Sequence, residues 1–355
     1  MIPLYKVFVP DNINDGIEEI LKSGQLTSGL NAKIFEKQIQ EFIGNPYVMV
    51  TGSNTFATLI ALSLCGLKNN DEVIASPMSC LASNQPVLNF GAKLIWADID
   101  PNTGTLDPKD VKKKITSKTK AILHYHWGGY PGYIDEINYI GNQFGIPVID
   151  DAIESFGSEY KGLKLGNTDT FFTTFSFQTV RLPNSIDGGA IAFRDRATYE
   201  KAIRMRDFGI DRATFRDNLG EISSKSDICY YGYNAIINEL NAFIGRKVME
   251  KTPALIDVQR KNILYWNNFC TESGYVSLNT RKEILPNYWI YSFLTPSQDI
   301  DIIRIRKKGY YASKVHIRND QYSCFGYFDE SLIGVNEFSK KQLSVPSGWW
   351  FKTYK

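Results

Sequence analysis

Short apolar runs alternate with segments of helical spacing from residue 47 to residue 193, and this alternation limits the possible folds more than any other feature of the sequence. The runs lie at residues 47–51, 72–75, 93–97, 120–124, 147–150, 171–175 and 189–193. Between them, helix-capping residues such as Ser53, Asp107 and Asp135 open the helical stretches. Strands that alternate with helices in this way predict an α/β fold, with a largely parallel sheet covered by helices on both faces.

A change of pattern near residue 234 predicts a second structural unit. Long helical stretches at residues 234–251 and 254–274 follow the last apolar run, and a mixed segment with the strand-like letters NYWIYSFL comes after them. A chain of 355 residues has room for one large or two moderate domains. We therefore expect a large domain over residues 1–250 and a smaller C-terminal domain over residues 251–355, joined by a long helix near 253–272.

The charge balance and the apolar runs bear on partners and location. Forty Lys and Arg residues face 38 Asp and Glu residues, so the formal charge of +2 gives no general basic field that would attract nucleic acid or an anionic membrane. No apolar stretch approaches the roughly 18 residues of a membrane-spanning helix, and a lysine and two prolines interrupt the apolar start MIPLYKVFVPDN. We expect a cytoplasmic protein that binds neither nucleic acid nor membranes.

The number and spacing of the cysteines and histidines argue against disulfide bonds and metal sites. The five cysteines are widely spaced and contain no CxxC pair, which predicts neither a disulfide framework nor a zinc site. Three histidines, at positions 124, 126 and 316, are too few and too scattered to suggest a metalloenzyme. We therefore expect no metal.

Polar residues follow three of the expected strands at the place where each strand ends. Ligands of open α/β sheets bind beyond the carboxyl ends of the strands, so these residues are candidates for a site. A glycine and three small polar residues after the first run would present backbone amides and a helix N-terminus to a phosphate. Each pattern alone also fits an ordinary helix cap or loop. The three groups are Gly52-Ser53-Asn54-Thr55, Asp150-Asp151-Ala152-Ile153-Glu154, and Ser176-Phe177-Gln178-Thr179-Val180-Arg181 followed by Asp187-Gly188-Gly189.

In their order and spacing these motifs resemble the DegT/StrS family of sugar aminotransferases, which are pyridoxal-phosphate (PLP) enzymes of the aspartate-aminotransferase fold. The resemblance implies a seven-stranded, mostly parallel sheet in a large domain and a smaller C-terminal α/β domain. It also implies transfer of an amino group from glutamate to a nucleotide-linked keto sugar, on a pathway to surface polysaccharide, by a homodimer. The matching stretches include TGSNTFATLIAL, PVIDDAIESFGSEYKGLKLG, FSFQTVRLPNSIDGGAI, YGYNAIINELNAFIGR and VHIRNDQYSCF.

The same resemblance implies a cofactor site. Asp151 matches the aspartate that pairs with the pyridine nitrogen and keeps the ring an electron sink, and Glu154 falls near the phenolic oxygen. Asn234 matches a phosphate contact that the partner subunit supplies, whereas Leu81 stands where many members have a stacked aromatic ring. The implied cofactor contacts are Asn54, Thr55, Leu81, Asp151, Glu154, Ser176, Gln178 and Asn234.

The C-terminal motif VHIRND implies contacts to the substrate. His316 and Arg318 lie where substrate loops of the family converge, and an arginine there would suit the phosphates of a sugar nucleotide. His124 and His126 flank the end of another strand, where either a ligand contact or internal packing would suit a histidine.

Position 181 departs from the family in its central residue. The family pattern places a lysine there, which forms a Schiff base with PLP and later shuttles a proton, whereas this chain has Arg181. A guanidinium keeps its proton and cannot form that bond. The sequence therefore predicts that PLP or pyridoxamine phosphate (PMP) binds without a covalent link, with Asp151 and Arg181 as the central residues.

Three explanations of Arg181 remain open. The arginine was introduced to stop turnover, or the chain is a natural variant that binds PMP, as in the sugar 3-dehydratase branch of the family, or the site has lost pyridoxal chemistry and only binds. The neighbours Leu182-Pro183-Asn184-Ser185 also differ from the usual loop, which favours natural divergence. The main hypothesis is an impaired or altered sugar aminotransferase, and the alternatives are a PMP-dependent dehydratase-like enzyme or a catalytically silent homologue.

Overall fold

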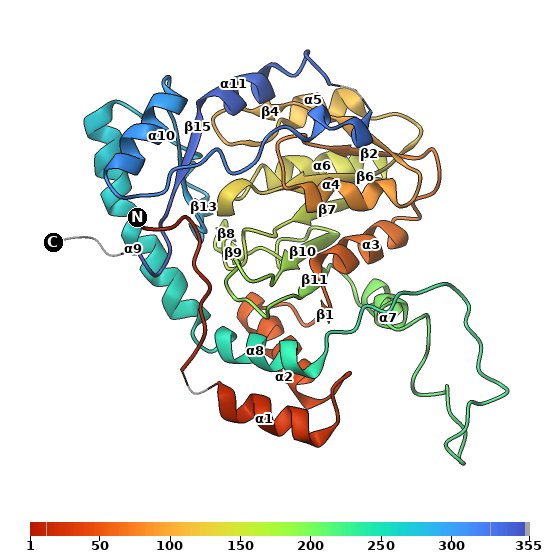
Figure 1. Ribbon diagram of the computed structural model, residues 1–355. Coiled ribbons are helices and arrows are strands. Elements are labelled where there is room, and N and C mark those ends of the chain that lie inside the picture. Colours follow the sequence, from red (N-terminus) through yellow and green to blue (C-terminus); the bar gives the residue numbers. More distant parts are fainter. Residues whose placement is uncertain (12, 327, 352–355) are drawn as a thin grey trace.

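The central element of the computed structural model, which describes residues 1–11, 13–326 and 328–351, is a seven-stranded sheet. Six strands run parallel and β11 runs antiparallel to both of its neighbours (Figure 1). All seven apolar runs of the sequence form these strands, so the prediction of a seven-stranded, mostly parallel sheet is confirmed. The spatial order is β1 (Val48–Thr51), β11 (Gly189–Phe193), β10 (Phe172–Ser176), β7 (Val148–Asp151), β6 (Thr119–Tyr125), β2 (Glu72–Ala75) and β3 (Lys93–Trp96).

Both faces of the sheet are buried, because alternate side chains of each strand enter different cores. In β11, Ile191 and Phe193 pack into one core, whereas Ala190 and Ala192 pack into another. The first core is covered by α3 (Asn54–Leu64), α4 (Leu81–Leu88) and α7 (Arg196–Met205). The opposite face is covered by α2 (Leu30–Ile43), α5 (Pro108–Lys114), α6 (Ile134–Phe144) and α8 (Glu239–Met249).

The C-terminal part is built around a smaller sheet. Its three antiparallel strands are ordered β12 (Val276–Ser277), β14 (Tyr291–Leu294) and β15 (Gln342–Val345). The long helix α9 (Thr252–Ser273) runs from the main sheet toward it (Figure 1). Helix α10 (Gln298–Lys307) packs near β15, and α11 (Ile333–Lys341) leads into it. A division of the chain into domains at about residue 250 stays a prediction.

Short elements complete the description. The start of the chain lies against the C-terminal part, since Ile2 forms a parallel bridge with Tyr310. In the described part of the chain, no helix is long and apolar enough to cross a membrane. The remaining elements are α1 (Asn14–Ser23), β4 (Ile99–Asp100), β5 (Thr105–Leu106), β8 (Glu159–Tyr160), β9 (Leu163–Lys164), β13 (Ile284–Leu285) and 3-10 turns at Trp127–Gly129, Asn319–Gln321 and Ser323–Phe325.

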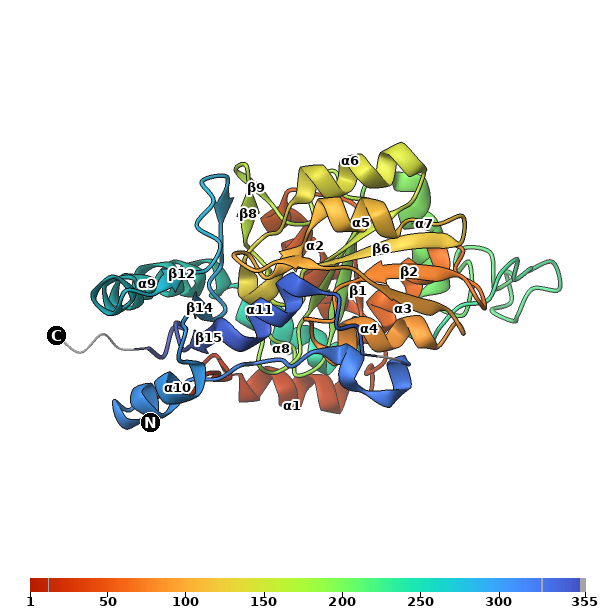
Figure 2. The ribbon, with the colours of Figure 1, turned by 90° about the horizontal axis from the view of Figure 1, so that it is seen from above.

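The segment between α7 and α8 leaves the body of the molecule. Both ribbon views show it projecting beyond the helices that cover the sheet (Figures 1 and 2). Several of its large apolar side chains are exposed. Exposed apolar groups that lie together on a surface commonly mark a site of contact with another molecule. These exposed apolar side chains are Phe208, Leu219, Ile222, Ile228 and Tyr231.

Candidate active site

Asp151 ends β7 in the middle of the sheet, beside the carboxyl ends of β6 and β10. Its side chain is almost fully buried, and Oδ1 accepts a hydrogen bond from the backbone N–H of Ile153 at 3.3 Å. Burial raises the pKa of Asp151 to about 6, although the hydrogen bond from the Ile153 N–H opposes that rise. Burial makes the carboxylate form of this acid unfavourable in the free protein, and a cationic partner would stabilise that form.

The start of α3 lies beside Asp151 at the same edge of the sheet. Ser53 caps the helix by accepting a hydrogen bond from Phe56 N–H, and Asn54 is the first helical residue. A side chain at Gly189 would place its Cβ 2.7 Å from the backbone nitrogen of Asn54, so only glycine allows β11 to approach the helix this closely. Ser176, which pairs with Gly189 in the sheet, is thereby held next to the helix start.

Four buried polar atoms at this edge have no hydrogen-bond partner among the residues that the structure describes. Buried polar groups of folded proteins are nearly always paired, so a cluster of unpaired ones calls for an explanation. Thr174 lies opposite Asp151 in the sheet register. A ligand with a ring nitrogen and polar substituents would supply the missing partners, and PLP and PMP fit this description. The atoms are Asn54 Oδ1, Ser83 Oγ, Asp151 Oδ2 and Thr174 Oγ1.

Glu154 is the centre of a second group of contacts. Its Oε2 accepts the backbone N–H of Gly128 at 2.8 Å, and its Oε1 lies 3.1 Å from Nε2 of His316 and 3.4 Å from Nη1 of Arg181. Burial alone would raise the pKa of Glu154, but the hydrogen bond from His316 and the charge of Arg181 outweigh it and lower that pKa. The carboxylate is therefore charged and fully engaged.

Arg181 is held from several sides. Its guanidinium lies 4.1 Å from the centre of the Trp289 ring, and the Trp289 indole N–H donates to Val180 O at 2.9 Å. Tyr5 stacks on the same indole, with ring centres 4.6 Å apart. A flat guanidinium suits this stacked position in a way that a lysine ammonium does not. The surroundings of position 181 thus match an arginine, and its side chain is nine-tenths buried.

The other predicted residues lie in varied surroundings. Thr55, Leu81, Gln178 and Asn234 are exposed in the single chain, so their cofactor roles stay predictions. Arg318 is buried and forms a two-pronged ion pair with Asp320, with a further hydrogen bond to Asn336. Most of its donors are therefore used inside the protein, and a contact to substrate phosphate would have to compete with them.

Four contributors were absent from the sequence-based site. Thr174 lies in the middle of β10 and Ser83 lies inside α4, so the rule that pointed to the residues after strand ends would not have pointed to either. Tyr5 and Trp289 are more than 100 residues from Arg181, and no local pattern indicates their contact.

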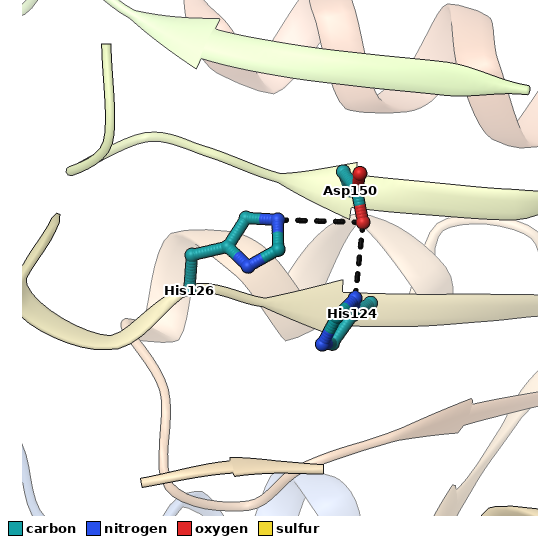
Figure 3. A group of neighbouring side chains, drawn as sticks. All are labelled: His124, His126 and Asp150. Atoms are coloured by element: carbon teal, nitrogen blue, oxygen red, sulfur yellow. Dashed lines mark hydrogen bonds and ion pairs between the residues drawn. The ribbon is translucent and has the colours of Figure 1, made fainter. Parts of the chain in front are cut away.

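The histidines of the HYHWGG motif form a separate buried cluster with Asp150 (Figure 3). Asp150 Oδ1 lies 3.0 Å from Nδ1 of His124 and 3.3 Å from Nε2 of His126, and Oδ2 accepts the Thr170 hydroxyl at 2.7 Å. The three ligand-type atoms lie within 4.8 Å of one another, as in a metal site. All three side chains are fully buried.

The hydrogen bonds of this cluster favour a proton network over a metal. Nδ1 of His126 accepts the backbone N–H of Gly132 at 3.0 Å, which leaves Nε2 as the ring nitrogen nearest Asp150. Burial lowers the pKa of His124 to about 4, which keeps that ring neutral at physiological pH. Burial acts to raise the pKa of Asp150, but the histidines outweigh it and lower that pKa. His124 and Thr170 thus donate to one buried carboxylate directly before Asp151, and the His126 ring lies against it.

Comparison with known proteins identifies the class of protein. The model of the DegT/DnrJ/EryC1/StrS aminotransferase family matches residues 9–324, and the chain belongs to this family. The crystal structure of AtS13 from Actinomadura melliaura has 30% identity and a TM-score of 0.91, with 99% of this chain and 95% of that chain covered. The sugar aminotransferase CalS13 from Micromonospora echinospora has 26% identity and a TM-score of 0.92, with 99% and 96% covered.

A curated relative adds a named activity. The UDP-2-acetamido-2-deoxy-3-oxo-D-glucuronate aminotransferase of Pseudomonas aeruginosa is 34% identical over 219 residues, which are 62% of this chain and 61% of that protein. Together with the fold and the family match, these likenesses confirm the resemblance seen in the sequence.

Proposed function

We propose that this chain binds PLP or PMP without a covalent bond and acts on a nucleotide-linked keto sugar, with glutamate as the amino donor of its family's reaction. The observation that carries the proposal is the group of unpaired buried polar atoms around Asp151 and the start of α3. The named activity of the Pseudomonas aeruginosa relative makes a UDP-linked 3-keto sugar the first substrate to test.

The residues of the site divide the work of binding between them. Asp151 would pair with the ring nitrogen, and the α3 N-terminus with Asn54, Thr55 and Ser176 would receive the phosphate. Leu81 and Gln178 would border the ring. When bound, the cofactor supplies an electron sink for reactions at the carbon next to its amino nitrogen.

Arg181 and Glu154 set the limits of this chemistry. Arg181 cannot offer a free amine, so the cofactor stays exchangeable and the usual proton carrier is missing. Its ion pair with Glu154 and its stacking on Trp289 hold the cation beside the expected cofactor. These contacts favour natural divergence over a single introduced change, since both partners suit the guanidinium.

A homodimer belongs to the same proposal. Asn234 is exposed in the single chain and pairs with Asp207 at the base of the projecting segment. That segment also carries the exposed apolar side chains described above, which a second copy would cover. Asn234 would then reach the cofactor phosphate of the partner subunit.

Cofactor titration tests the proposal directly. PMP and PLP should each bind saturably to the purified protein, and Asp151→Ala should abolish binding, whereas Asp135→Ala, an exposed acid on α6, should leave it unchanged. Absence of saturable binding by either compound would reject a PLP or PMP enzyme and leave the catalytically silent homologue. Binding without amino transfer to a keto sugar would favour the dehydratase-like alternative or a binding role.

A further inference from the structure

Amino transfer through PMP requires a group that moves a proton between carbon atoms, and position 181 cannot provide it. An arginine side chain stays protonated, so it can neither accept a proton from carbon nor return one. If the proposed function holds, another side chain beside Arg181 must carry that proton.

The titratable groups around Arg181 differ in their suitability. Burial raises the pKa of Tyr5, Tyr125 and Cys80, so these groups keep their protons near neutral pH. Glu154 is charged and accepts three donors already. His316 is the remaining group, and its imidazole has one nitrogen on Glu154 and a second that is free to act as an acceptor.

The other two histidines of the chain are unsuitable. His124 and His126 are fully buried, and both rings are engaged with Asp150 in the network of Figure 3. His316 differs from both because its side chain is 19% exposed.

Glu154 fixes which nitrogen of His316 is available. Nε2 lies 3.1 Å from the Glu154 carboxylate and therefore carries the proton of the neutral ring, which leaves the lone pair on Nδ1. Nδ1 has no hydrogen-bond partner in the part of the chain that the structure describes. A carboxylate that orients one ring nitrogen while the other acts as a base is a recurrent catalytic arrangement.

The backbone and the aromatic neighbours hold His316 in place. Val315, directly before it, has φ of +62°, a strained value for a β-branched residue. The His316 ring packs edge-on against Trp127, with centres 5.6 Å apart. Arg181 Nη1 and His316 Nε2 lie within 3.4 Å of the same Glu154 oxygen, so the histidine stands beside position 181.

We propose that His316 is the acid–base residue of this site, oriented by Glu154, in the role that an amine at position 181 would otherwise have. The proposal rests on the proposed function. His316 Nδ1 takes the proton when a C–H bond breaks at the PMP carbon that bears the amino group, and gives it back when a C–H bond forms at the former ketone carbon. The electron pair stays within cofactor and substrate, so the histidine ends unchanged and no further reactant is needed.

Chemical labelling tests the position of His316 without any turnover. Diethyl pyrocarbonate should modify His316 and spare the fully buried His124 and His126, as read by peptide mass spectrometry. Saturating PMP should slow that modification at least several-fold. Unchanged labelling in the presence of PMP that binds saturably would overturn the inference alone, whereas absence of PMP binding would overturn the proposed function itself.

Single-turnover kinetics test the chemical role. The PMP-loaded protein is mixed with 2-oxoglutarate, and the appearance of PLP is followed by absorbance. His316→Gln should slow this conversion about 100-fold, the lower end of general acid–base effects, while PMP affinity stays the same. Lys314→Gln, an exposed ion-paired position two residues earlier, is the matched control and should have no effect.

A second background makes the test specific. In the Arg181→Lys variant the new amine can carry the proton. Adding His316→Gln to this variant should therefore slow the conversion of PMP to PLP much less than it does in the wild-type protein. A wild-type protein that binds PMP but shows no conversion, or equal effects of His316→Gln in both backgrounds, would overturn the proposal.

Discussion

Two side chains hold the Arg181 guanidinium, and each suits a planar cation. The Trp289 ring stacks on the guanidinium, Glu154 pairs with Nη1, and the Trp289 indole fixes the adjacent backbone at Val180. Replacing Arg181 with lysine keeps the positive charge but changes the chemistry of the position, because lysine can lose its proton at moderate cost and arginine cannot.

Arg181→Lys should restore covalent cofactor attachment. With PLP the variant should develop a visible absorbance band, and borohydride reduction should leave a pyridoxyl group on residue 181, found by peptide mass spectrometry. The wild-type protein treated in the same way should carry none there. A variant that folds and still forms no adduct would mean that residues 182–186 do not aim position 181 at the cofactor.

Asp151→Asn should stabilise the cofactor-free protein in a pH-dependent manner. Burial raises the pKa of Asp151 from 3.8 to about 6, so ionising it weakens folding as the pH rises through that range, whereas both states are protonated at lower pH. The difference in unfolding free energy between the variant and the wild-type protein should be about 2 kcal/mol more favourable to the variant at pH 7.5 than at pH 4. Urea unfolding at the two pH values measures this.

The same substitution should remove cofactor affinity, because a neutral amide cannot pair with a protonated ring nitrogen. A variant that binds PMP as tightly as the wild-type protein would contradict the role of Asp151. Equal pH dependence of stability in both proteins would contradict the raised pKa.

At the scale of elements, the carboxyl ends of β6 and β7 are joined by the Asp150 network. His124 and Thr170 donate to one buried carboxylate, Nε2 of His126 lies 3.3 Å from it, and Thr170 lies outside both strands. The network fixes the end of β7 one residue before Asp151, so it stabilises the strand that carries the central residue of the site.

Thr170→Val should weaken this support. The change keeps the shape of the side chain but removes a hydroxyl donor 2.7 Å from a buried charge, and hydrogen bonds to charged groups contribute about 1.5–3 kcal/mol. Urea unfolding at pH 7.5 should show a loss of that size. Thr214→Val, in the exposed projecting segment, should change stability little. If Thr170→Val lowered the unfolding free energy no more than Thr214→Val, the Thr170 hydroxyl would not contribute to stabilising the Asp150 carboxylate.

At the scale of the whole molecule, a homodimer should form composite sites. Light scattering should give twice the mass of the chain, and mixing two defective variants tests the composition. If Asn234 serves the partner's cofactor, unfolding and refolding Asp151→Ala together with Asn234→Ala should create hybrid dimers with one intact site, or about one quarter of all sites. If each chain used its own Asn234, the mixture would recover no binding.

The seven apolar runs predicted every strand of the main sheet, because a buried strand needs only its own residues to be recognised. The motif order likewise predicted that Asp151, Asn54 and Ser176 would meet, since parallel strands present their carboxyl ends at one edge. Local periodicity and strand order therefore determined the architecture and the position of the site.

Tertiary structure decided which side chains surround the site. Trp289 lies against Arg181 and Tyr5 stacks on Trp289. His316 contacts Glu154 across 162 residues, and Asp320 forms an ion pair with Arg318. Such contacts depend on how the C-terminal part docks on the main sheet, which no short pattern encodes. The sequence by itself predicted a cofactor site at this edge of the sheet and determined that position 181 holds a permanent cation. Only the folded chain decided that this cation shares a carboxylate with a histidine, because the pairing depends on distance in space and not along the chain.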